Sequence, residues 1–360
     1  MLKVPTLLRL LMCMAGLLLA VPVLALLAFA FGIPLTLSGG FYLLGGFLFA
    51  MGLILAPWKP RTHLMLVSSG LIVILVVASL RIGGTRNTAS NLRVILLPSG
   101  RSTRVVNTLI DERDALLFGE GMLRLIGGVS PREHEGLIQA VVTAYQEAGI
   151  THGVFPSPVL STYLGLQKPS AFDALVIEPT VAQPGLTGIV FLHGYMGNVT
   201  LQCWEIARAV ERINAITVCP STDWIGDWWQ PDGEAIVRAS LRYLRERGVQ
   251  RIYLGGFSNG GHGVGSLASS LASEGDIEGL FFIAGVRNAA DVRGTGLPVL
   301  VIQGKNDDRI PVEAARQFVR EVGEQITYVE LEADHFLILK QHQQVQEALG
   351  TWLEAQEADN

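Results

Sequence analysis

Charged residues are scarce at the start of this 360-residue chain. Only 16% of all residues are charged, against about 25% in an average soluble domain. No Asp, Glu, Lys or Arg lies between Arg9 and Lys59, and none lies between Arg61 and Arg81. The first acidic residue is Asp111. These gaps exclude an ordinary soluble fold for this part of the chain, because the surface helices of soluble domains carry a polar face.

The two uncharged stretches predict three membrane-spanning helices, at residues 7–31, 33–57 and 63–80. A helix needs about 20 apolar residues to cross the hydrocarbon core of a bilayer. A buried helical core is the alternative, but it would need much longer apolar stretches than soluble domains use. The second segment is rich in glycine, which allows close contact between helices. Its glycines are Gly39, Gly40, Gly45, Gly46 and Gly52.

Basic residues beside these segments predict their orientation. Lys3, Arg9, Lys59 and Arg61 mark the cytoplasmic side by the positive-inside rule. Three crossings then leave the remainder of the chain outside the cytoplasmic (inner) membrane. Arg81 follows the third segment on that outer side, against the rule. If the third segment does not span the membrane, the remainder of the chain is cytoplasmic.

A cleaved signal peptide is another interpretation of the first segment. Residues 28–30 read Ala-Phe-Ala, which resembles a cleavage site, and the start of the chain is basic. The apolar stretch is longer than the apolar region of a usual signal peptide. We therefore expect a retained helix.

Cysteine is rare, with three residues in the whole chain. Cys13 lies in the first apolar segment, whereas Cys203 and Cys219 fall in a predicted helix and at the end of a predicted strand. A disulfide between these two would require an oxidising compartment. We expect two buried free thiols, because protein cores commonly hold single cysteines. No Cys/His cluster has the spacing of metal ligands, so no metal site is predicted.

Positive charge is also in short supply beyond the apolar part. From Asp111 onward there are 32 acidic and 18 basic residues, a net charge of −14. Such a region does not bind nucleic acid. No Gly-rich phosphate loop with its Lys-Ser/Thr pair is present, and there are no internal repeats.

What this acidic region does contain is an informative pattern around Ser258. Residues 256–260 read Gly-Phe-Ser-Asn-Gly, after an apolar run at 251–255 and before a predicted helix at 259–273. A strand, a Gly-x-Ser-x-Gly turn and a helix form a nucleophile elbow, whose strained turn presents the serine oxygen above the sheet edge. The glycines remove Cβ atoms that would clash there. The alternative is an ordinary serine in a Gly-rich turn.

Candidates for an acid and a base follow Ser258 in the chain order expected of such an enzyme. Asp307 and His335 each come after a short apolar run typical of a strand. His335 would take the proton from Ser258, and Asp307 would hold its tautomer and stabilise the imidazolium. Asp308 is an alternative acid. The side chain of Asp334 is expected to point away from its neighbour His335.

Upstream, residues 193–197 read His-Gly-Tyr-Met-Gly after an apolar run. Such a loop supplies half of an oxyanion hole, and we expect the backbone N–H groups of Tyr195 and Asn259 to be the donors. His193 is predicted to shape the turn through hydrogen bonds and not to react.

A tryptophan-rich segment at 220–231 follows another predicted strand. Loops at the carboxyl ends of strands build the site in open α/β sheets. Trp224, Trp228 and Trp229, together with Met196, are therefore candidates for an apolar substrate pocket. The alternative is that the tryptophans pack against the helix that follows.

These four features, in this order, resemble the α/β-hydrolase superfamily. The carboxylesterase- and lysophospholipase-like members are most similar, since they often carry a Gly-Phe-Ser-x-Gly-Gly elbow, which Gly261 completes here. The resemblance covers about residues 171–355. It implies a mostly parallel sheet flanked by helices over residues 171–360. The composition, and not the resemblance, predicts about three transmembrane helices before it, within residues 1–82.

Residues 83–170 match no family that we can identify. We expect either the amino-terminal part of the hydrolase sheet or a cover over its site. Short strands are predicted at 94–97 and 105–109. Ser130 and Glu133 predict a capping box, at the start of a helix that runs to about Ala148.

The expected protein is a membrane-anchored serine hydrolase that cleaves carboxylic esters through an acyl-enzyme, without a cofactor. A peptidase, a lipid acyl hydrolase or a thioesterase would use the same triad. A non-catalytic membrane protein that keeps the fold as a binding module is the alternative of another class. The expected partners are a small-molecule or lipid ester and the membrane.

Overall fold

The computed structural model describes residues 6–30, 34–87, 91–180 and 187–358. The chain forms two compact units, each made of two stretches. The helical unit comprises Met1–Thr85 and Thr108–Gly128, and the sheet unit comprises Arg86–Asn107 and Val129–Asn360. Residues 83–170, which matched no known family, are thus divided between the two units.

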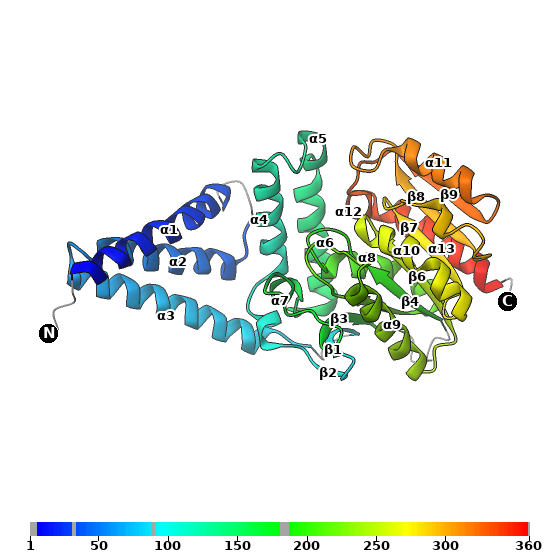
Figure 1. The fold of residues 1–360 in the computed structure, drawn as a ribbon. Helices are drawn as coiled ribbons and strands as arrows, with labels where there is room; N and C mark the ends of the chain where they lie inside the picture. Colours follow the sequence, from blue (N-terminus) through cyan, green and yellow to red (C-terminus); the bar gives the residue numbers. More distant parts are fainter. Residues whose placement is uncertain (1–5, 31–33, 88–90, 181–186, 359–360) are drawn as a thin grey trace. The chain divides into compact units, whose positions relative to one another are not determined.

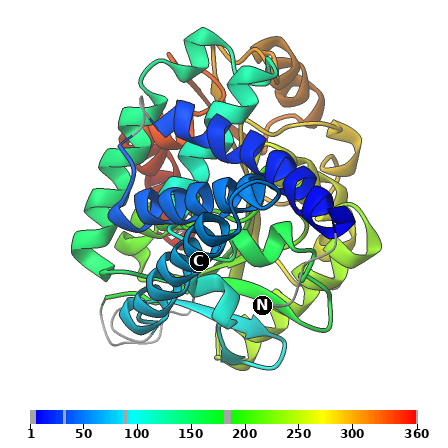
Figure 2. The same cartoon turned by 90° about the vertical axis from the view of Figure 1, so that its left-hand side faces the viewer.

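The helical unit contains three long apolar helices, α1 (Thr6–Ala30), α2 (Leu37–Leu55) and α3 (Pro60–Gly84). Each is long and apolar enough to cross a membrane, and α2 packs against both α1 and α3 (Figures 1 and 2). The helix α2 begins later than predicted because Thr36 caps it, and α3 begins earlier because proline fits a first helical turn. The predicted ends at residues 31 and 33 lie outside the described residues.

Glycines bring α2 and α3 into backbone contact. A Cβ atom on Gly45 would lie 3.1 Å from the carbonyl oxygen of Gly70, and one on Gly52 would lie 2.8 Å from the backbone nitrogen of Val67. These two glycines therefore have the predicted role in helix packing. A Cβ atom on Gly40 would meet nothing within 4 Å.

A fourth helix, α4 (Glu112–Leu125), belongs to the helical unit. Asp114 accepts hydrogen bonds from the backbone N–H of Thr36, at 2.9 Å, and from the Thr36 hydroxyl. Arg81, near the end of α3, forms an ion pair with Asp111 at 3.2 Å. The start of α2 and the end of α3 are therefore both tied to the segment around the start of α4.

The described residues of the sheet unit form nine strands in the order β2-β1-β3-β5-β4-β6-β7-β8-β9 (Figure 1). Strands β5 to β9 and β4 run parallel, while β1 and β3 pair antiparallel at one side. All residues of the inner strands β4 and β8 are buried, which is typical of a sheet covered on both faces. The strands are β1 (Leu92–Leu97), β2 (Arg101–Ser102), β3 (Phe172–Ile177), β4 (Thr187–Leu192), β5 (Ile216–Pro220), β6 (Arg251–Phe257), β7 (Gly279–Ile283), β8 (Val299–Gly304) and β9 (Ile326–Leu331).

Helices connect these strands and cover the sheet, which gives an α/β-hydrolase fold as predicted. The helices are α5 (Pro131–His134), α6 (Leu137–His152), α7 (Val159–Tyr163), α8 (Thr200–Ala209), α9 (Pro231–Glu246), α10 (Asn259–Glu274), α11 (Val312–Val322), α12 (Leu337–Lys340) and α13 (His342–Ala358).

Three local predictions for the segment before β3 have different outcomes. The strand predicted at 94–97 is present as β1, but the one at 105–109 is wrong, because Val105–Thr108 forms a 3-10 helix. The capping box of Ser130 and Glu133 is confirmed. The single helix predicted after it is divided into α5 and α6, because Gly136 adopts a φ of 74°, which does not continue a helix.

Cys203 on α8 and Cys219 on β5 are joined by a disulfide. The expectation of two free thiols was therefore wrong. Packing of α8 on the sheet brings the two Cα atoms to 6.0 Å, within the range that a disulfide spans. The sequence did not reveal which face of the helix carries Cys203.

Candidate active site

Ser258 occupies the turn between β6 and α10. Its φ of 53° and ψ of −119° are those of a strained residue, since L-residues rarely adopt positive φ. The Ser258 N–H donates to the carbonyl of Ile283 on β7, at 3.1 Å, and this bond holds the turn against the sheet. A Cβ atom on Gly260 would lie 1.9 Å from the carbonyl oxygen of Leu192, so only glycine fits there. The predicted elbow geometry is present.

His335 lies between Ser258 and Asp307. Its Nε2 atom is 3.0 Å from the Ser258 hydroxyl oxygen, and its Nδ1 atom is 2.9 Å from Oδ2 of Asp307. Both distances are those of hydrogen bonds. His335 and Asp307 are each 4% exposed. The three residues predicted from the sequence are thus brought together from the ends of three different strands.

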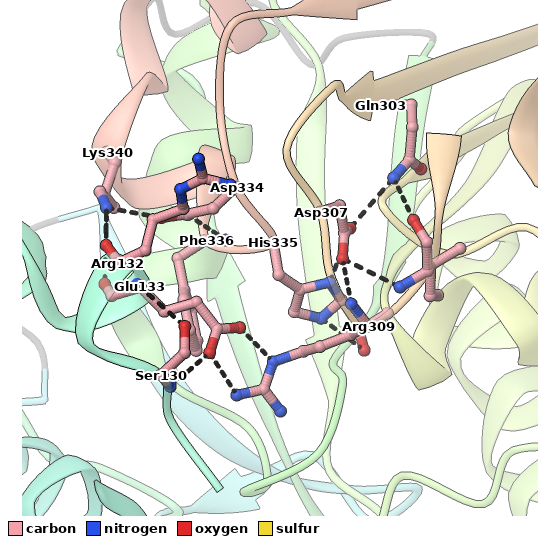
Figure 3. A network of polar contacts seen from close by, with 12 residues as sticks. Ser130, Arg132, Glu133, Gln303, Asp307, Arg309, Asp334, His335, Phe336 and Lys340 are labelled. Atoms are coloured by element: carbon pink, nitrogen blue, oxygen red, sulfur yellow. Dashed lines mark hydrogen bonds and ion pairs between the residues drawn. The ribbon is translucent and has the colours of Figure 1, made fainter. Parts of the chain in front are cut away.

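Both oxygens of the Asp307 carboxylate are hydrogen-bonded (Figure 3). Oδ2 accepts from His335 and from the Gln303 side chain, at 3.0 Å, and Oδ1 accepts from the backbone N–H groups of Arg309 and Ile310, both at 2.9 Å. Burial alone would raise the pKa of Asp307, but the His335 interaction and the two backbone donors outweigh it and hold the pKa below its usual value. The carboxylate is therefore ionised at neutral pH and suited to orient an imidazole.

Asp308 and Asp334, the acidic sequence neighbours of Asp307 and His335, have other surroundings. Asp308 is exposed. Asp334 forms an ion pair with Lys340 at 2.6 Å and accepts from the backbone N–H of Phe336. Asp307 is the carboxylate in contact with His335, and Asp334 points away from the ring as expected.

The loop after β4 lies against the nucleophile. A Cβ atom on Gly194 would be 2.9 Å from Cβ of Ser258. The Met196 N–H is already bound to the carbonyl of Trp224, at 2.8 Å, so it cannot serve a substrate. Asn259 is the first residue of α10, where an N–H has no acceptor within its own helix. This geometry leaves the N–H groups of Tyr195 and Asn259 as the candidate oxyanion donors.

Aromatic side chains form an exposed ledge above this loop. The ring of Trp224 stacks on Tyr163, with centroids 6.5 Å apart, and meets the ring of Tyr195 edge-on at 5.2 Å. The three rings are between 40% and 47% exposed. The Tyr163 hydroxyl lies 3.5 Å from the Met196 sulfur. Met196 is thus part of the predicted oxyanion loop and Trp224 contacts that loop, which is compatible with the predicted pocket role of both.

The prediction of a pocket role for Trp228 was wrong. Trp228 is fully buried, and its indole N–H donates to the carbonyl of His193 at 2.8 Å. It holds the base of the oxyanion loop and does not line open space. Trp229 is partly exposed and packs beside His262 and under the Arg287 guanidinium, next to α10.

Two further histidines lie close to the site. His193 is buried, its ring accepts from the backbone N–H of Thr222 at 3.3 Å, and burial lowers its pKa to about 4. It shapes the turn as predicted. His262 is four residues after Ser258, and burial together with Arg287 lowers its pKa to about 4. The sequence analysis missed His262, although the spacing of one helical turn was a usable signal.

Within the described ranges, no three His, Cys, Asp or Glu side chains are grouped as metal ligands would be.

Comparison with known proteins yields similarities of structure only. No protein-family model and no curated protein matches the sequence. An α/β serine hydrolase homologue from Coxiella burnetii is 18% identical over 50% of this chain and 91% of its own, with a TM-score of 0.41. Est1E from Butyrivibrio proteoclasticus is 17% identical over 52% of this chain and 95% of its own, with a TM-score of 0.45. The esterase domain of a Rhodothermus marinus protein is 18% identical over 51% of this chain and 92% of its own, with a TM-score of 0.43. These are similarities of fold.

Proposed function

We propose that the chain is a membrane-anchored serine hydrolase that cleaves carboxylic esters through an acyl-enzyme. The observation that carries the proposal is the continuous hydrogen-bonded series from Ser258 through His335 to Asp307, with contacts of 3.0 and 2.9 Å. Nucleophile, base and orienting acid need this geometry for acyl transfer.

In the proposed mechanism, His335 takes the Ser258 proton as the serine oxygen attacks the ester carbonyl carbon. Asp307 holds the Nδ1–H tautomer and stabilises the imidazolium, which then protonates the leaving alcohol. Water, activated by the same histidine, releases the acid and restores Ser258. No cofactor takes part in these steps.

The negative charge that develops on the carbonyl oxygen would be held by the N–H groups of Tyr195 and Asn259. Each such donor is worth roughly 3 kcal/mol of transition-state stabilisation. The amino terminus of α10 adds a favourable dipole at the same point. The aromatic ledge beside the loop favours an ester with an apolar acyl or alcohol group.

We also propose that the sheet unit lies outside the cytoplasmic membrane. Lys3 and Arg9 lie at the start of the first apolar helix, and Lys59 and Arg61 lie at the junction of the second and third, so these two places would be cytoplasmic and the third helix would lead outside. The Cys203–Cys219 disulfide supports this side, because disulfides persist in oxidising compartments.

The test of the activity is labelling of membranes with a fluorophosphonate probe, followed by turnover of p-nitrophenyl esters of rising chain length. The expected result is labelling by the wild type and a loss of several orders of magnitude in both signals for Ser258→Ala. Ser273→Ala, an exposed serine on the same helix, is the matched control and should behave as wild type. A folded wild type that neither labels nor turns over any ester would favour the non-catalytic binding module.

The test of the orientation uses fusions after Asn360 in a bacterial host. Alkaline phosphatase there should be active and green fluorescent protein dark, and protease added to spheroplasts should digest the sheet unit. Full protection until lysis would place the domain in the cytoplasm and would leave the chemistry of Ser258 untouched.

A further inference from the structure

The segment that opens α5 contacts the two loops that carry the acid and the base. Glu133 is 4% exposed, and its carboxylate has two sets of partners. One is its own capping box, in which Oε2 accepts from the Ser130 N–H at 2.8 Å. The other is Arg309, 176 residues later in the chain, whose Nε donates to Oε1 at 2.6 Å (Figure 3).

Arg309 in turn contacts both catalytic loops. Its backbone N–H donates to Oδ1 of Asp307 at 2.9 Å. Its guanidinium lies over the Phe336 ring, 5.3 Å from the centroid, and Phe336 meets the His335 ring edge-on at 5.8 Å. A shift of Arg309 would therefore change the contacts that hold Asp307 and His335 in place.

A second contact joins the same segment to the histidine loop. Lys340 forms an ion pair with Asp334 at 2.6 Å, and its ammonium lies 3.4 Å from the backbone carbonyls of Arg132 and Glu133. The opening turn of α5 is thus tied to the loop after β8 and to the loop after β9.

We propose that Glu133 is a positioning residue, which acts through Arg309 to hold Asp307 and His335 in line with Ser258. Glu133 does not touch the reacting atoms. The proposal rests on the proposed hydrolase function, and its basis is geometric: misplacing a catalytic group by about 1 Å can cost on the order of 100-fold in rate.

The test compares substitutions at Glu133 and its neighbours in the full-length protein in detergent. Glu133→Gln keeps the capping box, since glutamine serves at that position, but removes the charge that binds Arg309. We expect kcat for a p-nitrophenyl ester to fall about 10- to 100-fold, with KM nearly unchanged. Glu135→Gln, the same change at an exposed residue, should leave both constants as in the wild type.

Two more variants separate positioning from stability. Ser130→Ala removes the cap but keeps the Glu133–Arg309 pair, so the melting temperature should fall while kcat is retained. Arg309→Lys should lower kcat as Glu133→Gln does, and the double variant should be no worse than either single one. Arg309→Lys also provides the test if Glu133→Gln does not fold. Additive losses, or a kcat that follows the melting temperature across all variants, would overturn the proposal.

Amide hydrogen exchange gives a readout that does not need the enzyme to be active. In Glu133→Gln the N–H groups of Arg309 and Ile310, which bind Asp307, should exchange roughly 10-fold faster than in wild type or Glu135→Gln. Unchanged exchange would overturn the positioning role. A wild type without hydrolase activity, but with this change in exchange, would contradict the proposed function and leave the Glu133–Arg309 connection standing.

Discussion

Each unit buries an aspartate whose two carboxylate oxygens are both hydrogen-bonded, and the two differ in their partners. Among the described residues, Asp114 in the helical unit accepts from Thr36, through one N–H and one hydroxyl. Asp307 in the sheet unit accepts from two side chains and two backbone N–H groups. The exposed fractions are nearly equal, at 5% and 4%.

The pKa values of these two aspartates move in opposite directions. Burial raises the pKa of Asp114, because the hydrogen bonds from Thr36 do not compensate for desolvation. The pKa of Asp307 is lowered because His335 and the backbone donors outweigh burial. At nearly equal burial, the number and charge of the donors therefore decide in which direction the pKa of a buried carboxylate moves.

The largest expected difference between the two aspartates is the effect of an Asp→Asn substitution on kcat. Asp307→Asn should lower kcat about 10⁴-fold, because an amide at this position favours the wrong His335 tautomer. Asp114→Asn, far from the reacting groups along the chain and in the other unit, should leave kcat within about twofold, since its hydrogen-bond partner Thr36 belongs to the helical unit. The measurement is ester turnover by the purified full-length variants.

Asp308→Asn is the control for that experiment and should cost little, because Asp308 is exposed. A larger loss from Asp308→Asn than from Asp307→Asn would contradict the assignment of the acid.

Glu205 tests the same rule within the sheet unit, because its buried carboxylate has fewer hydrogen-bond donors than that of Asp307. It is 2% exposed, one oxygen accepts from Gln346 and lies 4.0 Å from the Arg208 guanidinium, and the other has no hydrogen-bond partner among the described residues. Burial raises its pKa to about 7 from 4.5. A raised pKa means that its contribution to stability is full below pH 4.5 and is lost as the pH rises through about 7. Glu205→Met should therefore gain on the order of 1–3 kcal/mol relative to wild type between pH 4.5 and 8.

The measurement is the melting temperature of both proteins across that pH range. A difference in melting temperature between wild type and Glu205→Met that does not change with pH would mean that Glu205 is ionised throughout this range. The number of donors would then not decide the pKa of a buried carboxylate.

The smallest expected effect is a pair of opposite pH trends in stability. Because the pKa of Asp307 is lowered, its contribution to folding stability is present above about pH 4. This contribution is lost as the pH falls through the folded-state pKa. The contribution of Asp114, whose pKa is raised, is present below about pH 4 and is lost as the pH rises. Relative to wild type, Asp114→Asn should thus gain stability toward neutral pH and Asp307→Asn should lose it. Melting temperatures with parallel trends would refute this difference.

The sequence predicted the site better than its surroundings. Ser258, Asp307 and His335 could be proposed because each lies in the loop that follows a strand, and parallel strands bring their carboxyl ends to one edge of the sheet. Trp228 could not be assigned, because strand-end position does not tell whether a side chain points into the core. The Glu133–Arg309 contact was also out of reach, since residues 176 positions apart meet only through the tertiary fold.

Longer-range organisation was least predictable. The three apolar helices were found from composition alone, but the place of Thr108–Gly128 in the helical unit comes from tertiary contacts, which include those of Arg81 with Asp111 and of Thr36 with Asp114. The break between α5 and α6 depended on the backbone conformation of Gly136. Neither leaves a periodic signal in the sequence.

The interleaving of the two units has a practical consequence for expression of the protein. The chain passes from one unit to the other at residues 85/86, 107/108 and 128/129. Removing everything before residue 171 would delete β1, which is the partner of β3 in the sheet. Removing only residues 1–85 would leave Asp111 and Asp114 without Arg81 and Thr36. A soluble version of the sheet unit therefore requires two cuts in the gene: a new start at Arg86, and a short polar linker in place of Thr108–Gly128.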